Sequence, residues 1–273
     1  MKTLIASLAS LLLCLVPAGA RAGTVTVKGS DTLVILGQRW AEEFMKKNPA
    51  AKLQVTGGGS GVGLAALLNG TTDIAMSSRP IKDSENEQLR TRYKAPAKQV
   101  AVAKDGVTFY VNEKNPLTAL SAEQLRDIYL GDTTGWKAVG GPDAPIVLYS
   151  RENSSGTYAF VKEHLLKGED YAASAQTLPG TAAVVNAVAK EKNGIGYGGA
   201  AYAKGVKELN VRVGQESIAP SAENIKSGKY PLSRELYFYV RGEPTGDAKA
   251  FMDYILSAEG QALATQVGYF PVK

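Results

Sequence analysis

The stretch SRENSSGTY, residues 150 to 158, places one arginine and one glycine among four serine and threonine hydroxyls. It contains no histidine or cysteine, and no GKS or GKT ending of a nucleotide-binding phosphate loop. Hydroxyls, backbone N–H groups made accessible by glycine and a guanidinium are all hydrogen-bond donors, and a guanidinium binds oxyanions with two parallel bonds. The chemistry that this composition predicts is therefore the binding of a small anion.

Three other segments offer the same kinds of donor: GSDT (29–32), GGGSGVG (57–63) and SSRP (77–80). A tetrahedral oxyanion accepts several hydrogen bonds, and helix N-termini add unpaired N–H groups with a favourable partial charge. Taken singly, each segment has an ordinary explanation as a helix cap, a turn or a surface ion pair. Taken together, they predict one shared anion site with these ligand residues: Ser30, Asp31, Thr32, Ser60, Ser78, Arg79, Arg151, Ser155, Gly156 and Thr157.

Each of these segments directly follows a predicted β-strand. Alternating or apolar runs predict strands at residues 24–28, 53–55, 73–76 and 146–149. Helices are expected between them, which is typical of an α/β fold with parallel strands. Because ligands bind beyond the carboxyl ends of such strands, we expect the first three segments to converge on one sheet edge. The fourth segment is expected to present its donors from a second lobe.

The strand–helix pattern restarts near Asn112, which predicts two lobes rather than one core. A long strand at 100–111 is expected to be interrupted at 104–106, SAEQ (121–124) is a capping box, and LYFYV (236–240) is an apolar strand. We expect the chain to cross between the lobes twice. The predicted organisation is a leader at 1–22, a first lobe at 23–112 and 232–273, and a second lobe at 113–231.

Residues 1–22 have the composition of a secretory leader. Lys2 precedes an apolar run, and Ala20-Arg21-Ala22 matches a cleavage site, so cleavage is expected after Ala22. The sole cysteine, Cys14, lies in this leader, so the mature chain has none for disulfide or thiol chemistry. Removal of the leader leaves 251 of the 273 residues and lowers the net charge from +5 to +3. This surplus is too small to indicate a nucleic-acid-binding protein.

In this order behind a leader, TVKGSDTL, GGGSGVG, TDIAMSSR and SRENSSGT resemble the motifs of the phosphate-binding proteins of bacterial phosphate ABC transporters (PstS-like). The resemblance covers nearly the whole mature chain, and R-x-x-S-S-G-T is its most specific part. It implies an α/β, two-lobed periplasmic binding protein of type 2, with parallel or mixed sheets and phosphate in the interlobe cleft. It also implies a monomeric periplasmic protein that delivers inorganic phosphate to an ABC permease in the inner membrane, without a cofactor, a metal or a catalytic residue.

The chain departs from this family at one position. Better-known members have an aspartate, which accepts the proton of hydrogen phosphate, where this chain has Ser78. A carboxylate acceptor rejects sulfate, because two negative groups would meet without a proton between them. Asp31 is the first candidate to replace it, with helix capping as its alternative role. Glu152 is the second candidate, with orientation of Arg151 as its alternative role. The extra guanidinium of Arg79 is expected to favour the dianion.

Three other functions remain open. The same fold and arginines would serve sulfate, molybdate or another oxyanion. A secreted phosphatase is a weaker alternative, because the single histidine, His164, is expected to pack on a helix or lie in solvent. GGGSGVG also has Val62 where the nucleophile motif G-x-S-x-G requires glycine. An adhesion or matrix role would suit a secreted anion-binding protein.

Trp136 and Tyr197 are expected either in the core or at the cleft mouth.

We predict that Asp31→Asn narrows the preference for phosphate over sulfate, because an amide no longer repels an unprotonated dianion. Calorimetric titration with each anion measures the two affinities. An unchanged ratio would exclude Asp31 as the proton acceptor.

Overall fold

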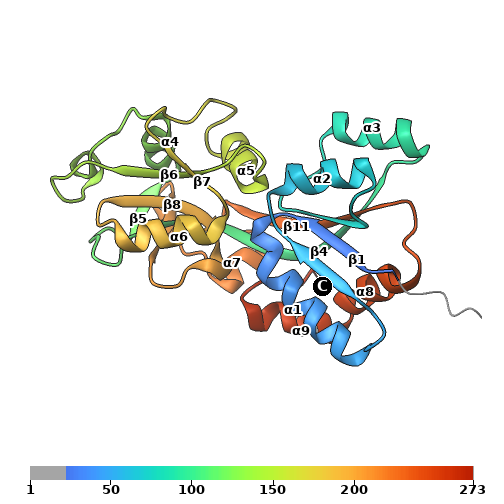
Figure 1. Ribbon diagram of the computed structural model, residues 1–273. Coiled ribbons are helices and arrows are strands. Elements are labelled where there is room, and N and C mark those ends of the chain that lie inside the picture. Colours follow the sequence, from blue (N-terminus) through green and yellow to red (C-terminus); the bar gives the residue numbers. More distant parts are fainter. Residues whose placement is uncertain (1–22, 273) are drawn as a thin grey trace, which may run out of the picture.

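The computed structural model describes residues 23–272, which form two α/β lobes side by side (Figure 1). The leader predicted at 1–22 lies outside the described residues. Both ends of the described chain belong to the first lobe, and the second lobe lies between β4 and β11 in the sequence. The elements of the first lobe are β1 (Val25–Gly29), α1 (Asp31–Lys47), β2 (Leu53–Thr56), α2 (Ser60–Asn69), β3 (Ile74–Ser77), α3 (Asp83–Tyr93), the first part of β4 (Ala97–Val111), β11 (Ser233–Arg241), α8 (Gly246–Leu256) and α9 (Ala258–Val267).

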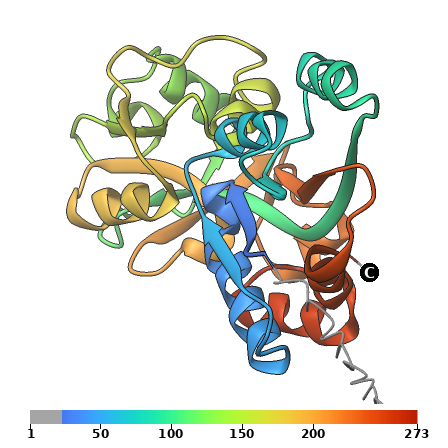
Figure 2. The same ribbon diagram turned by 45° about the vertical axis from the view of Figure 1, so that its right-hand side comes forward.

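The sheet of the first lobe is mixed, with the strand order β2-β1-β3-β11-β4. β1 pairs in parallel with β2 and β3, whereas β11 runs antiparallel to β3 and β4. Helices α1, α8 and α9 pack on one face, and α2 and α3 pack on the other (Figure 2). Trp40 of α1 joins two of these helices, because its indole N–H donates to the carbonyl of Gly260 in α9 at 2.8 Å.

Among residues 23–272, no helix combines the length and apolar character needed to cross a bilayer.

The second lobe is built on the end of β4 followed by β8, β6 and β7. The capping box predicted at 121–124 is confirmed, since Ser121 Oγ accepts from the Gln124 N–H at 3.1 Å and Gln124 Oε1 accepts from the Ser121 N–H at 2.9 Å. Trp136 and Tyr197 are fully buried in the core of this lobe. The elements are β5 (Ala119–Ser121), α4 (Ala122–Leu130), β6 (Val147–Arg151), α5 (Gly156–His164), β7 (Gln176–Leu178), α6 (Thr181–Lys190), β8 (Gly194–Gly199), β9 (Lys207–Val213), β10 (Glu216–Ile218), α7 (Ala222–Ser227) and the short 3-10 helices Trp136–Val139 and Ala200–Tyr202.

Two strands connect the lobes. β4 pairs with β11 as far as Gly106 and with β8 from Val107 onward, so its change of partner lies inside the strand. The chain returns at Ser233, where β11 begins. The predicted interruption of the strand at 104–106 is wrong, because β4 continues through these residues. A buried charge is tolerated there since Asp105 lies opposite Arg234 of β11 and bonds to it.

Helix α2 lies very close to β1 at Gly63. A Cβ atom on this residue would lie 2.5 Å from the carbonyl oxygen of Lys28 and 2.6 Å from the Cα of Gly29. Both are backbone atoms, which cannot move aside as a side chain can, so the close approach requires glycine. The Gly59 N–H also donates to the Gly29 carbonyl at 2.9 Å. The start of α2 is therefore fixed beside the carboxyl end of β1.

Gly63→Ala is expected to lower the free energy of unfolding by about 1–3 kcal/mol, because the added methyl group has to displace backbone. Ala65→Ser, at an exposed position of the same helix, is the matched control and is expected to change it by less than about 0.5 kcal/mol. Urea denaturation followed by circular dichroism measures both. Equal stability of Gly63→Ala and the wild type would contradict the close packing.

Candidate functional site

Three helices begin at the predicted ligand segments. α1 begins at Asp31, α2 at Ser60 and α5 at Gly156. In α2 and α5 the hydroxyl-rich segments form the first helical turns. Ser155 is the N-cap of α5, since its Oγ accepts from the Tyr158 N–H at 3.2 Å. The three helix N-termini supply unpaired backbone N–H groups where the two lobes meet.

The hydroxyls of Thr32, Ser60, Ser78 and Thr157 form a buried group between the lobes, called the hydroxyl cluster below. Thr32 Oγ1 of the first lobe lies 2.9 Å from Thr157 Oγ1 of the second. Ser60 Oγ lies 3.4 Å from Ser78 Oγ and accepts from the Ser78 N–H at 3.0 Å. Each of the four residues is at most 1% exposed. The hydroxyl of Ser30 is also buried and has no hydrogen-bond partner within residues 23–272, so it is available as a further donor.

Glycines allow the two lobes to meet at this cluster. A Cβ atom on Gly156 would lie 2.3 Å from Ser60 Oγ and 2.6 Å from Ser78 Oγ. Beside it, the Gly61 N–H donates to the Ser154 carbonyl at 2.9 Å. Gly156 therefore lies in the contact between the lobes, at a point with no room for a side chain.

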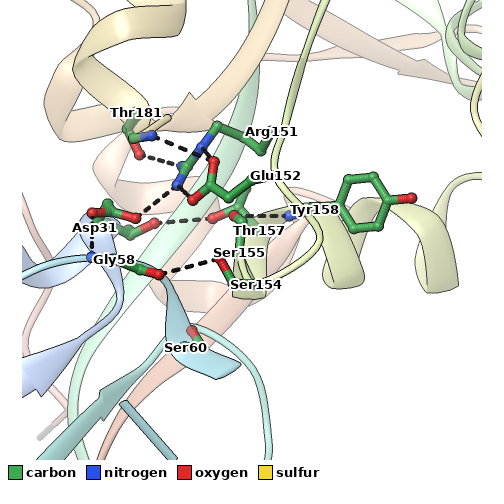
Figure 3. Close-up of polar contacts among 12 residues, drawn as sticks. Asp31, Gly58, Ser60, Arg151, Glu152, Ser154, Ser155, Thr157, Tyr158 and Thr181 are labelled. Carbon is green, nitrogen blue, oxygen red and sulfur yellow. Dashed lines mark hydrogen bonds and ion pairs between the residues drawn. The ribbon is translucent and has the colours of Figure 1, made fainter. Parts of the chain in front are cut away.

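Arg151 of the second lobe also joins the two lobes, and Figure 3 shows its guanidinium between Asp31, Glu152 and Thr181. Its Nη2 donates to Asp31 Oδ2 at 2.9 Å and to Glu152 Oε1 at 2.8 Å, and its Nη1 donates to Thr181 Oγ1 at 2.9 Å. The second oxygen of Asp31 accepts from the Gly58 N–H at 2.9 Å. Burial alone would raise the pKa of Glu152, but the hydrogen bonds and charge of Arg151 outweigh burial and lower this pKa. Glu152 thus remains ionised and orients the arginine.

The guanidinium of Arg79 points toward α3. It donates to both carboxylate oxygens of Glu85, at 2.8 and 2.6 Å, and to the Pro80 carbonyl at 2.9 Å. Glu85 is held in turn by the N–H of Lys82 at 2.9 Å. No hydrogen bond joins the side chain of Arg79 to the hydroxyl cluster in residues 23–272. Arg79 instead lines a neighbouring pocket of about 290 Å³, together with Ser78 and Arg234.

Arg234, which the sequence analysis did not select, contacts the hydroxyl cluster directly. Its Nη2 donates to Thr157 Oγ1 at 3.0 Å, and its Nη1 donates to the Ser78 carbonyl at 3.1 Å. It also bonds Asp105 Oδ2 through Nη2 at 2.8 Å. The two side chains are only 3% and 2% exposed. Burial raises the pKa of Asp105, although the guanidinium opposes this shift.

The sequence carried a weak signal for this pair. Asp105 interrupts an apolar run, and Arg234 lies two residues before the strand LYFYV. A charge at the edge of a buried strand is expected to need a partner. Which charge is the partner depends on how β4 and β11 pair, and local sequence does not specify that register.

The site offers donors rather than catalytic groups. Within residues 23–272 there is no cluster of histidine, cysteine and carboxylate side chains suited to a metal ion. His164 stacks on Phe160 of the same helix, with ring centroids 4.1 Å apart, and its Nδ1 lies 3.0 Å from the Phe160 carbonyl. Helix N-termini, hydroxyls and guanidinium groups are suited to hold a small oxyanion without a covalent step.

Comparisons with known proteins show the family to which the chain is related. A model of the PBP superfamily domain matches residues 16–259. The chain is 32% identical over 269 residues to the phosphate-binding protein PstS of Pseudomonas aeruginosa, covering 92% of this chain and 83% of that protein. It is 33% identical over 251 residues to the phosphate-binding protein PstS of Bacillus subtilis, with coverages of 92% and 81%. A crystal structure of a phosphate ABC transporter substrate-binding protein from Clostridium perfringens with bound phosphate matches with a TM-score of 0.85, at 31% identity, over 92% of this chain and 100% of that one.

Gly156→Ala is expected to separate the lobes, because its methyl group would overlap Ser60 and Ser78. Small-angle X-ray scattering should show a larger radius of gyration than in the wild type. Gly61→Ala is the matched control, since its Cβ would lie 3.4 Å from the Ser154 carbonyl oxygen, close to ordinary van der Waals contact. An unchanged radius for Gly156→Ala would contradict the tight contact.

Proposed function

The chain belongs to the PBP superfamily and to its phosphate-binding proteins named PstS, and we propose that it captures inorganic phosphate between its lobes and delivers it to an ABC permease. The observation that carries the proposal is the buried hydroxyl cluster, to which both lobes contribute. Helix N-termini surround it, and the related Clostridium perfringens protein has phosphate bound. The proposed ligand residues are those selected from the sequence, with the exception of Arg79, whose guanidinium is bound to Glu85.

The number of donors is sufficient for tight binding. Hydrogen bonds to a charged group contribute roughly 1.5–3 kcal/mol each. Several of them exceed the roughly 8 kcal/mol that corresponds to a micromolar dissociation constant. The excess is expected to offset removal of water from the anion and ordering of the two lobes. Affinity should therefore depend strongly on how completely the donors are arranged before binding.

Asp31 is better placed to hold the lobes together than to accept a phosphate proton. Both of its carboxylate oxygens have donors, the Gly58 N–H and the Arg151 guanidinium. Its backbone carbonyl also accepts from the hydroxyl of Tyr202 at 2.6 Å. A carboxylate engaged in this way limits the freedom of Arg151. The choice between phosphate and sulfate is then expected to involve neutral hydroxyls, which both donate and accept.

The proposed transport function implies that the protein acts outside the inner membrane. The leader at 1–22 supports export, and we place the mature chain in the periplasm after cleavage near Ala22. There it is expected to act as a monomer without nucleic acid or cofactor. The closed lobes would present one combined surface to the permease, so that closure reports that phosphate is bound. A binding role of this kind needs no catalytic residue, and we propose none.

Thr157→Val is expected to weaken phosphate binding by about tenfold, because it removes a hydroxyl from the cluster while the side-chain shape is kept. Thr177→Val, at an exposed position in β7 of the same lobe, is the matched control and should bind phosphate like the wild type. Isothermal titration calorimetry with inorganic phosphate measures all three proteins. Phosphate analysis of the denatured wild type should also find about one ion per chain.

Absence of phosphate from the protein and of heat on titration would exclude the proposed function. Turnover of a chromogenic phosphomonoester by the pure protein would favour the phosphatase alternative.

A further inference from the structure

Arg234 and Asp105 lie on the two strands that connect the lobes. They are direct neighbours in the antiparallel pairing of β4 with β11. Asp105 is followed by Gly106, after which β4 changes its partner to β8. Arg234 is the second residue of β11 after the chain returns from the second lobe. The ion pair therefore lies at the connection about which the lobes would move.

The guanidinium of Arg234 contacts both lobes at once. It reaches the first lobe through the Ser78 carbonyl, at 3.1 Å, and the hydroxyl of Thr32, at 3.5 Å. It reaches the second lobe through the hydroxyl of Thr157, at 3.0 Å. Among the contacts of residues 23–272, no other arginine side chain donates to the hydroxyl cluster. A positive charge at this connection thus meets the first-lobe side of the site directly, and it meets the second-lobe side when the helix carrying Thr157 is in place.

Helix α5 holds the same guanidinium on a second side. The carbon at the centre of the Arg234 guanidinium lies 5.2 Å from the centroid of the Phe160 ring, which is within the range of a cation–π contact. Phe160 is one turn beyond Thr157 in α5, so one helix presents both a hydroxyl and a ring to the arginine. Phe160 also lines the pocket of about 290 Å³ that includes Ser78, Arg79 and Arg234. We expect an ion to approach Arg234 from this pocket.

The two buried arginines differ in how fully their charge is compensated. Arg151 bonds two carboxylates, Asp31 and Glu152, whereas Arg234 bonds Asp105 alone. When all five of these side chains are ionised, two arginines are paired with three carboxylates, so their combined charge is negative. A dianion is then bound favourably only where a guanidinium donates to it directly. Arg234 meets this condition, because its donors already lie on the hydroxyl cluster.

The geometry points to Arg234 as an anion-binding residue supplied by the connection between the lobes, with Asp105 as the residue that positions it. This inference rests on the proposed function. It adds a ligand residue whose positive charge favours binding of a dianion. Asp105 Oδ2 accepts hydrogen bonds from one edge of the guanidinium, from Nε at 3.2 Å and from Nη2 at 2.8 Å. The remaining nitrogen, Nη1, donates to the Ser78 carbonyl. An anion in the cluster would then be bound by the arginine together with first-lobe donors, and closure of the lobes would add the hydroxyl of Thr157.

Arg234→Gln tests this inference, and it should weaken phosphate binding by about 10- to 100-fold, the loss expected for one charged hydrogen-bonding group. Arg234→Lys keeps the charge without the planar fork and should give an intermediate loss. Arg241→Gln is the matched control, since Arg241 belongs to the same strand and donates to the carbonyls of Leu67 and Thr72. Its phosphate affinity should stay within about threefold of the wild type. Isothermal titration calorimetry measures all four proteins.

A double variant separates anion binding from a purely structural role. Arg234→Gln alone leaves Asp105 buried without its cation, which by itself destabilises a protein. Arg234→Gln combined with Asp105→Asn removes this penalty, so the melting temperature without phosphate should recover. If Arg234 binds the anion, phosphate affinity of the double variant stays about tenfold or more below the wild type. Recovery of wild-type affinity in the double variant would overturn the inference.

Two further outcomes are distinguishable. A wild-type protein that binds no phosphate would contradict the proposed function itself. A wild type that binds phosphate, with no loss in Arg234→Gln and a large loss in Arg79→Gln, would contradict only the assignment of Arg234. It would show that Arg79 turns toward the ion, as its position next to Ser78 in the sequence predicts.

Discussion

The structure depends on a layer of polar groups that are hydrogen-bonded across the two lobes. Buried hydroxyls, amides and charges are unfavourable unless they are hydrogen-bonded. Here the partners come from the opposite lobe: Thr32 meets Thr157, and Asp31 meets Arg151. The backbone follows the same rule, since the Gly61 N–H donates to the Ser154 carbonyl. The closed arrangement is therefore the one that satisfies these groups, and an anion placed among them would accept from the same donors.

Close approach of backbone makes this polar layer possible. Gly63 lets α2 lie against β1, and this contact places Ser60 at the start of the helix beside the end of the strand. Gly156 then lets the start of α5 meet Ser60 from the other lobe. Each glycine removes a side chain where two backbones or hydroxyls must come together. The same close approaches at glycine therefore determine both the packing of the helices and the geometry of the site.

Charge compensation links this site to the connection between the lobes. Both buried arginines are held by carboxylates, so neither is an isolated buried charge. Arg151 is held by residues of both lobes, and Arg234 is held by the neighbouring connecting strand. Their positions make the electrostatics of the site depend on the relative placement of the lobes. Capture of an anion and closure of the lobes then share the same contacts.

The sequence by itself determined the features that depend on neighbouring residues. It predicted the strands, the capping box at Ser121, the hydroxyl-rich segments after the strands and the family to which they belong. Only the tertiary structure decided which arginine faces the hydroxyl cluster. Arg79 is adjacent to Ser78 in the chain, yet Glu85 binds it, whereas Arg234 reaches the cluster from a distant strand. The physical reason is that strand register between β4 and β11 sets this placement, and register is fixed by packing across the whole sheet rather than by local sequence.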